Sequence, residues 1–215
     1  SQAQLPQASD EIWAGFVRAF EFDSELEESL ISGTYRVDYG EFGDLAAYAH
    51  AVSHMTVAQT VARAGGPINV LPSSGELELD IRTLPGQSDD DVDRAITEAL
   101  GELAEHVTIE RLLSEPATAS SIDTKLYRAI EETLTQANPG AKVVPILFPG
   151  GSDLRVGRHK GGVGYGFGSC SSGATLGQVY SQLHAHDEHI AVEDVVSTVC
   201  ALDHLTRVFI YPEKA

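Results

Sequence analysis

The sequence contains little cysteine and no long apolar run. Its two cysteines, Cys170 and Cys200, are too few for a disulfide framework and lack the CxxC spacing of redox and zinc motifs, so both are expected to be thiols in a reducing compartment. No apolar run approaches membrane-spanning length, and the first residues lack the basic and apolar parts of a secretory leader. These absences predict a cytoplasmic protein.

Positive charge is also scarce. The 215 residues include 14 Lys and Arg against 32 Asp and Glu, which gives a net charge of −18. Such a charge repels phosphate backbones and anionic lipid surfaces, which argues against nucleic acid and membranes as partners. Apolar residues make up 42% and charged residues 21%, an ordinary globular balance that excludes wholesale disorder.

Hydrophobic periodicity in the first half predicts a small layer of strands and helix. Residues 77–82 alternate between apolar and charged, as a half-buried strand does. Ser88 then begins a capping pattern for an apolar stripe over 92–103, and residues 107–112 alternate again. The order strand, helix, strand indicates an α+β layer whose sheet is antiparallel.

The second half has a different pattern, separated from the first by a composition break at residues 114–121. Apolar stripes predict helices over 122–134 and 192–209. Between them, residues 143–148 and 163–167 are nearly continuous apolar runs, typical of buried strands in a parallel sheet, although a proline interrupts the first run. The fold class is therefore predicted to be α/β.

The segment from His184 to His189 concentrates possible metal ligands. It reads His-Ala-His-Asp-Glu-His, and neutral imidazole is a good ligand for Zn²⁺ while a nearby carboxylate can fix the ring tautomer. A complete zinc site needs three or four ligands, and no H-E-x-x-H motif is present. A solvated turn before the last helix is the alternative.

The segment from Gly150 to Arg155 is a glycine-rich turn that follows a predicted buried strand. Open α/β sheets bind ligands at such positions, where Asp153 and Arg155 would face the crevice. It is not a phosphate loop, because no G-K-[ST] follows it. The alternative is a tight turn whose Asp caps the next segment and whose Arg is solvated.

Arg82 lies on the wet face of a predicted strand. A guanidinium there can bind a carboxylate through two hydrogen bonds. The alternative is a surface ion pair with Asp80, which contributes little to stability.

The order of these segments is more specific than any one of them. They read Gly65-Gly66-x-x-Asn69-Val70-Leu71-Pro72, then Asp80-x-Arg82-x-x-Pro85-Gly86, then Gly150-Gly151-Ser152-Asp153-x-Arg155, then Gly166-Phe167-Gly168, then His184-x-x-Asp187-Glu188. In this order the chain resembles the co-catalytic zinc amidohydrolases and exopeptidases, the family of acetylornithine deacetylase, succinyl-diaminopimelate desuccinylase, aminoacylase and carboxypeptidase G. The likeness runs from about residue 45 to residue 209, and residues 1–44 match no motif.

The resemblance implies a catalytic α/β domain with two Zn²⁺ ions, interrupted by a small ferredoxin-like lid that mediates dimerisation. Residues 1–113 would be the later part of the lid, and residues 114–215 the closing part of the catalytic domain. Its site residues fall into two groups. His184 matches a metal ligand, and the substrate-binding positions are Asn69, Arg82, Gly151, Asp153 and Arg155. The resemblance also implies a homodimer, in which Asn69 reaches the partner's site.

The chain also departs from the family pattern, because it lacks most of the family's catalytic residues. The family's H-x-D ligand motif, bridging Asp, Glu-Glu pair and lid histidine all precede the part that this chain matches, and none has a counterpart here. About half of a family member is thus missing, and the absence of an initiator methionine agrees with a longer gene product. His186 is a second possible ligand beside His184, and Ser152 stands where Thr is common.

The sequence therefore predicts part of a zinc-dependent hydrolase that cleaves an amide or peptide bond next to a free carboxylate. Its substrate would be a small acyl-amino acid or peptide, and the chain alone would be inactive because it lacks the carboxylate base. Two alternatives stay open. One is a non-catalytic dimerisation or interaction module, and the other is an unrelated metal sensor that uses His184, His186 and His189.

Overall fold

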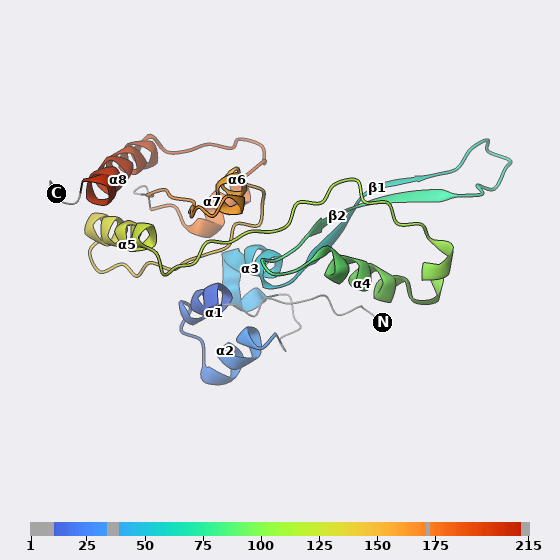
Figure 1. Cartoon of the computed structure of the whole chain (residues 1–215), viewed down its shortest axis with the longest axis horizontal. Helices are drawn as coiled ribbons and strands as arrows, with labels where there is room; N and C mark the ends of the chain where they lie inside the picture. Colours follow the sequence, from blue (N-terminus) through green and yellow to red (C-terminus); the bar gives the residue numbers. More distant parts are fainter. Residues whose placement is uncertain (1–10, 34–38, 171–172, 212–215) are drawn as a thin grey trace. The chain divides into compact units, whose positions relative to one another are not determined.

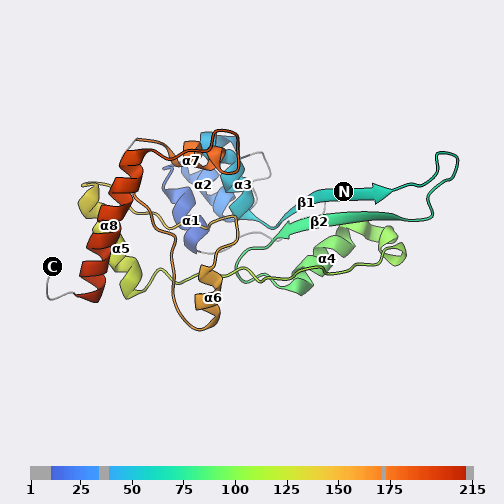
Figure 2. The ribbon, with the colours of Figure 1, turned by 90° about the horizontal axis from the view of Figure 1, so that it is seen from above.

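The computed structural model describes residues 11–33, 39–170 and 173–211, which form a mixed α/β protein as the sequence predicted (Figures 1 and 2). By contacts the chain divides into two compact units. Unit 1 contains Ala51–Thr118, and unit 2 contains the described residues up to His50 together with those from Ala119 onward. The second change of unit lies between Thr118 and Ala119, and residues 11–50 pack within unit 2. The roles assigned to domains 1–113 and 114–215 stay predictions.

Unit 1 is built on one antiparallel hairpin. Strand β1 (Thr56–Ala64) pairs with β2 (Gly75–Arg82), with Thr56 opposite Arg82 and Ala64 opposite Gly75. A bulge between Gln59 and Val61 interrupts the register. The alternating segment at 77–82 thus forms the strand that its period predicted.

Helix α4 (Asp89–Leu100) follows the hairpin and continues into the 3-10 helix η2 (Gly101–His106). Ser88 caps α4 in a reciprocal box, because its hydroxyl accepts from the Asp91 N–H and the Asp91 carboxylate accepts from the Ser88 N–H at 2.8 Å. These hydrogen bonds from Ser88 favour the ionised carboxylate and lower the pKa of Asp91.

The strand predicted over residues 107–112 is wrong: the structure shows no regular element there. The segment is joined to α4 by side chains instead. Arg111 forms ion pairs with Asp89 at 3.1 Å and Asp93 at 2.7 Å, and Ser114 Oγ donates to Asp89 at 2.8 Å. Side-chain contacts to α4, rather than pairing in a sheet, therefore hold this segment.

Unit 2 contains a core of aromatic residues that no sequence motif predicted. It is formed by α1 (Glu11–Arg18), α2 (Ser24–Ile31), the 3-10 helix η1 (Gly40–Leu45) and the start of α3 (Ala46–Ser53). Phe16 stacks on Phe42 with ring centroids 5.5 Å apart, and the buried Trp13 donates its indole N–H to the Leu30 carbonyl at 3.0 Å. The aromatic residues that pack on one another in this core include Trp13, Phe16, Phe20, Phe42 and Tyr48.

A second core in unit 2 lies between two helices that are side by side in both views (Figures 1 and 2). Helix α5 (Lys125–Ala137) is capped by Thr124, and α8 (Val192–Ile210) is the long last helix, so both predicted helices are confirmed. Their buried residues Ala129, Ile130 and Leu205 meet at the centre of the contact.

The two strands predicted over 143–148 and 163–167 are not formed in the described part of the chain. A parallel strand exists only where neighbours accept and donate its ladder hydrogen bonds. Here Tyr165 and Phe167 pack against the α5–α8 core, and both backbone polar groups of Gly164 bond to Ser120. The apolar runs are therefore held by side chains and loops. No described helix combines the length and apolar character needed to cross a bilayer.

Candidate functional site

The two candidate residues of unit 1 lie at opposite ends of the hairpin. Asn69 is exposed in the turn beyond Ala64, where the Val70 N–H donates to the Pro67 carbonyl at 3.0 Å. Arg82 ends β2 opposite Thr56. Strand β1 separates these positions by about 25 Å along the hairpin, since each residue of a strand advances about 3.3 Å. Asn69 and Arg82 of one chain are therefore not brought together around one small carboxylate.

Arg82 forms the surface ion pair that was the alternative interpretation of its motif. Its Nη2 and Nε atoms donate to Asp80 Oδ2 at 2.8 and 3.2 Å. The two side chains are 56% and 44% exposed. A pair so open to water is weak, and a substrate carboxylate could exchange with Asp80 at modest cost.

The glycine-rich turn places its polar residues around the first turn of α6 (Leu154–His159). Asp153 occupies the N-cap position without a side-chain cap hydrogen bond and is fully exposed, and Arg155 Nη1 lies 3.9 Å from its Oδ1 atom. A Cβ at Gly150 would lie 2.7 Å from Cε1 of the exposed Phe148 ring, so a side chain at this position would displace that ring. Around Gly151 no described atom lies within 4 Å of such a Cβ, which leaves the turn open on that side.

The histidine segment is an exposed, strained turn after α7 (Leu176–Gln182). His184 and Asp187 both have left-handed φ angles, 60° and 62°, which cost energy in residues other than glycine. The turn is held locally, because Glu188 Oε2 accepts from the His184 N–H at 3.2 Å and His189 Nδ1 lies 2.7 Å from the Asp187 carbonyl oxygen.

Tyr48 and Tyr180, which the sequence analysis did not select, connect the two candidate loops of unit 2. The Tyr48 hydroxyl donates to the Leu147 carbonyl at 2.7 Å, three residues before Gly150. The Tyr180 ring, on α7, lies 5.0 Å from that of Tyr48 and 6.4 Å from that of Phe148. Burial raises the pKa of both tyrosines. The glycine-rich turn and the histidine turn thus begin at one aromatic cluster.

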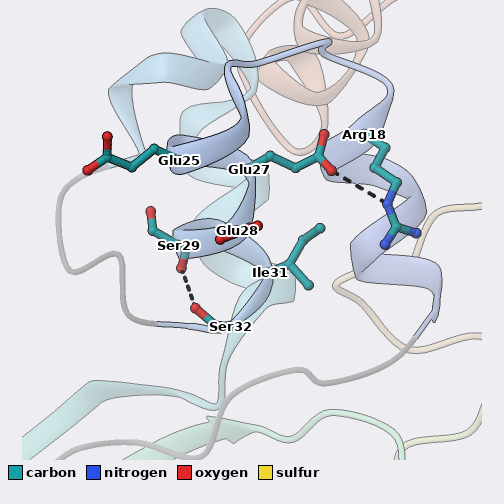
Figure 3. A pocket seen from close by; sticks show the side chains of 7 residues that line it. All are labelled: Arg18, Glu25, Glu27, Glu28, Ser29, Ile31 and Ser32. Atoms are coloured by element: carbon teal, nitrogen blue, oxygen red, sulfur yellow. Dashed lines mark hydrogen bonds and ion pairs between the residues drawn. The ribbon is translucent and has the colours of Figure 1, made fainter.

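An open pocket of about 660 Å³ lies between α1 and α2 and contains none of the predicted site residues (Figure 3). Three carboxylates, Glu25, Glu27 and Glu28, line it, and Arg18 pairs with Glu27 at 3.7 Å. Its acidic lining does not suit the anionic substrates that the sequence pattern predicts.

The described residues do not complete a metal site. Across residues 11–33, 39–170 and 173–211, no group of three His, Cys, Asp or Glu side chains is placed to hold one ion. The histidine turn can supply His184, or His186 in its place, but a zinc ion needs at least three protein ligands. The residues present can therefore supply part of the ligand set of a zinc site, but not a complete set.

Zinc binding by this chain is expected to be weak. One or two exposed histidines leave the tetrahedral shell to be filled by water, so calorimetric titration should give a dissociation constant in the micromolar range or weaker, and His184→Ala should weaken it further. A tight stoichiometric site that is lost in His189→Ala as well as in His184→Ala would instead favour the metal-sensor hypothesis.

A match to a known protein family covers most of the chain. The sequence matches peptidase family M20/M25/M40 over residues 12–207, a range that includes every candidate residue. Over 107 residues it is 27% identical to a probable carboxypeptidase S-like protein of Dictyostelium discoideum, an alignment that covers 49% of this chain and 20% of that protein. The chain thus spans about a fifth of the length of this relative. No solved structure matches it. The chain belongs to peptidase family M20/M25/M40.

Proposed function

We propose that this chain is the C-terminal part of a zinc-dependent hydrolase that cleaves an amide or peptide bond next to a free carboxylate. The family match over residues 12–207 carries the proposal, and the name of the Dictyostelium relative, a carboxypeptidase, agrees with a substrate that ends in a carboxylate. Substrates of this class are N-acyl amino acids and short peptides. The finer family is that of the deacetylases and amidohydrolases named above.

Two guanidinium groups support recognition of an anion. Arg82 and Arg155 are both accessible to solvent, and each lies beside an aspartate two residues away in sequence. A guanidinium offers five N–H donors in a planar fork that matches a carboxylate. Because the Asp80–Arg82 contact is exposed, an incoming carboxylate displaces Asp80 from Arg82 without leaving a buried charge unpaired.

The zinc ions of this hydrolase would be held only in part by the chain described here. His184 supplies one ligand in this proposal, and the remaining ligands and the carboxylate base belong to a preceding part of a longer polypeptide. The open positions of the glycine-rich turn and the histidine turn, both attached to the Tyr48–Tyr180 cluster, support one shared site in unit 2.

A second candidate function is a non-catalytic dimerisation or interaction module. The exposed apolar residues of α8 favour it, since Val192, Val196 and Val199 are 75%, 56% and 60% exposed. Large apolar patches on a soluble protein commonly mark a contact surface.

Binding of the substrate carboxylate by Arg155, which we call the substrate clamp, is tested with the longer polypeptide and a matched pair of substrates. We expect N-acetyl amino acids to be hydrolysed and their C-terminal carboxamides to be poor substrates. Arg155→Ala should lower kcat/KM by about 10- to 100-fold, because it removes charge-assisted hydrogen bonds to the carboxylate. Arg94→Ala, which removes an exposed guanidinium on α4, is the control and should leave kcat/KM unchanged. Equal hydrolysis of the acid and the carboxamide would contradict the proposal.

A further inference from the structure

The guanidinium of Arg158 joins helix α6 to the segment around Ser120 and to the segment around Gly164, which follows the helix. Its Nε atom donates to Ser120 Oγ at 3.0 Å, and its Nη2 atom donates to the Gly164 carbonyl at 2.6 Å. The Ser120 hydroxyl in turn accepts from the Gly164 N–H at 3.0 Å and lies 3.1 Å from the Gly164 carbonyl. Both backbone polar groups of Gly164 are therefore used by Ser120, and one of them also by Arg158.

Helix α6, which carries Arg158, depends on such contacts for its geometry. It has only six residues, two of which are the β-branched Val156 and the flexible Gly157. A helix of this length is not stable alone in water, and an interior glycine costs a further ~1 kcal/mol relative to alanine. The direction of α6 is consequently set by the surface on which it docks.

Helix α6 docks on the segment around Gly164, and one face of the helix makes the contact. Leu154 and Arg158 are four residues apart and lie on the same side of the helix. A Cβ at Gly164 would lie 2.9 Å from Leu154 Cδ2, so the two segments approach closely where Leu154 packs. After the helix, the Gly162 N–H donates to the Gly157 carbonyl at 3.0 Å and folds the chain back toward Gly164.

The segment that receives α6 is itself fixed to the helical core. The Tyr165 hydroxyl donates to the Ser121 carbonyl at 2.6 Å and lies 2.6 Å from Thr124 Oγ1, the N-cap of α5. The Tyr165 ring packs against the α5–α8 core. A continuous series of contacts thus runs from α5 and α8 through Gly164 to α6.

We propose that Arg158 is a positioning residue that fixes the direction of Arg155, and so the geometry with which the chain binds a carboxylate. This inference rests on the proposed function, in which Arg155 binds the substrate anion. Arg155 follows Leu154 by one residue and lies about 100° around the helix from the docked face. When Arg158 holds that face against Gly164, the Cα–Cβ bond of Arg155 is held in one direction; without Arg158, we expect α6 to turn and unwind.

Hydrogen exchange of the 215-residue chain tests the anchor in the absence of any ligand. In Arg158→Ala we expect the amides of Val156 to Gly162 to exchange about tenfold faster or more, the effect of losing hydrogen bonds to a charged group, while the amides of α5 and α8 keep their protection. Arg128→Ala removes an exposed guanidinium that pairs with Asp123 at 2.7 Å on the same unit and should change neither region. Ser120→Ala removes the same network without touching α6 and should also speed exchange there. Unchanged exchange in α6 in both variants would overturn the proposal, and so would equal loss of protection in α5 and α8.

The nuclear magnetic resonance signal of the Arg155 Nε–H group tests the link to binding. In the parent chain, added N-acetylglycine should shift this signal; in Arg158→Ala the shift should require about tenfold more ligand, with Arg158→Lys between the two because an ammonium group keeps the charge and loses the planar fork. If the parent chain shows no shift, the clamp of the proposed function is wrong, whatever the exchange data show. If the parent chain binds and Arg158→Ala binds equally well, Arg155 binds the anion and the role of Arg158 is overturned.

Discussion

The 215-residue chain with added Zn²⁺ is expected to release no product from N-acyl amino acids or dipeptides. A hydrolase of the proposed type needs a carboxylate base to take a proton from the attacking water, and such a base contributes about 10²- to 10⁴-fold to the rate. The described residues provide no three-ligand metal group, and the Glu25, Glu27 and Glu28 carboxylates belong to a pocket that holds none of the candidate site residues. The missing carboxylate base and the incomplete metal site both affect the attack of water on the substrate. No turnover above that of buffer is therefore expected.

The control for this measurement is His184→Ala, made and purified in parallel. Any turnover that persists unchanged in this variant comes from a contaminating hydrolase. Turnover that is present in the parent chain and absent from His184→Ala would show that the chain is catalytic by itself, and the proposal that it is one part of a larger site would then be wrong.

Helices could be predicted from this sequence, because their hydrogen bonds lie within one segment. The capping pattern of Ser88 and Asp91 and the stripes around Ile130 and Leu205 are local signals, and each predicted helix is present with shifts of about three residues or fewer at its ends. Val143–Phe148 and Val163–Phe167 are different. Their patterns describe what a strand would bury, but a strand also needs partners on its edges, and no local pattern supplies them.

The sequence predicted which residues belong to the candidate site better than it predicted where those residues lie. The separation of Asn69 from Arg82 depends on the register of a nine-residue strand, which a spacing in sequence does not contain. The Asp80–Arg82 pair was one of two interpretations, and the structure contains it. Tyr48 and Tyr180 had no signal, since single aromatic residues of this kind more often serve packing than function and their partners are distant in sequence.

Self-association of the chain at micromolar concentration is the second large effect that we expect. One stripe of α8 exposes apolar side chains three and four residues apart. Its most exposed members are Val192, Val195, Val196, Val199, Leu202 and Phe209. Covering half-exposed side chains of this size stabilises a complex by about 1 kcal/mol each, so two apposed stripes can offset the cost of association and bring a dimer into the micromolar range.

Apolar burial is opposed by a net charge of −18 on each copy. Physiological salt screens charges beyond about 8 Å, so the repulsion falls steeply with salt whereas the apolar contact does not. The dimer is therefore expected to strengthen between low and physiological ionic strength, which sedimentation velocity measures directly. A surface held together by ion pairs would weaken over the same range.

A double variant on α8 separates the apolar stripe from the overall charge. Val196→Glu with Val199→Glu places two carboxylates in the stripe and should convert the dimer to a monomer, because each new charge would have to be desolvated at the contact. Thr135→Glu with Gln136→Glu adds the same two charges to exposed positions of α5 outside the stripe, and this variant should stay dimeric. If both double variants dissociate equally, charge alone controls assembly. A parent chain that sediments as a compact monomer and melts cooperatively would show that the stripe needs no partner, and the expected homodimer would then be wrong.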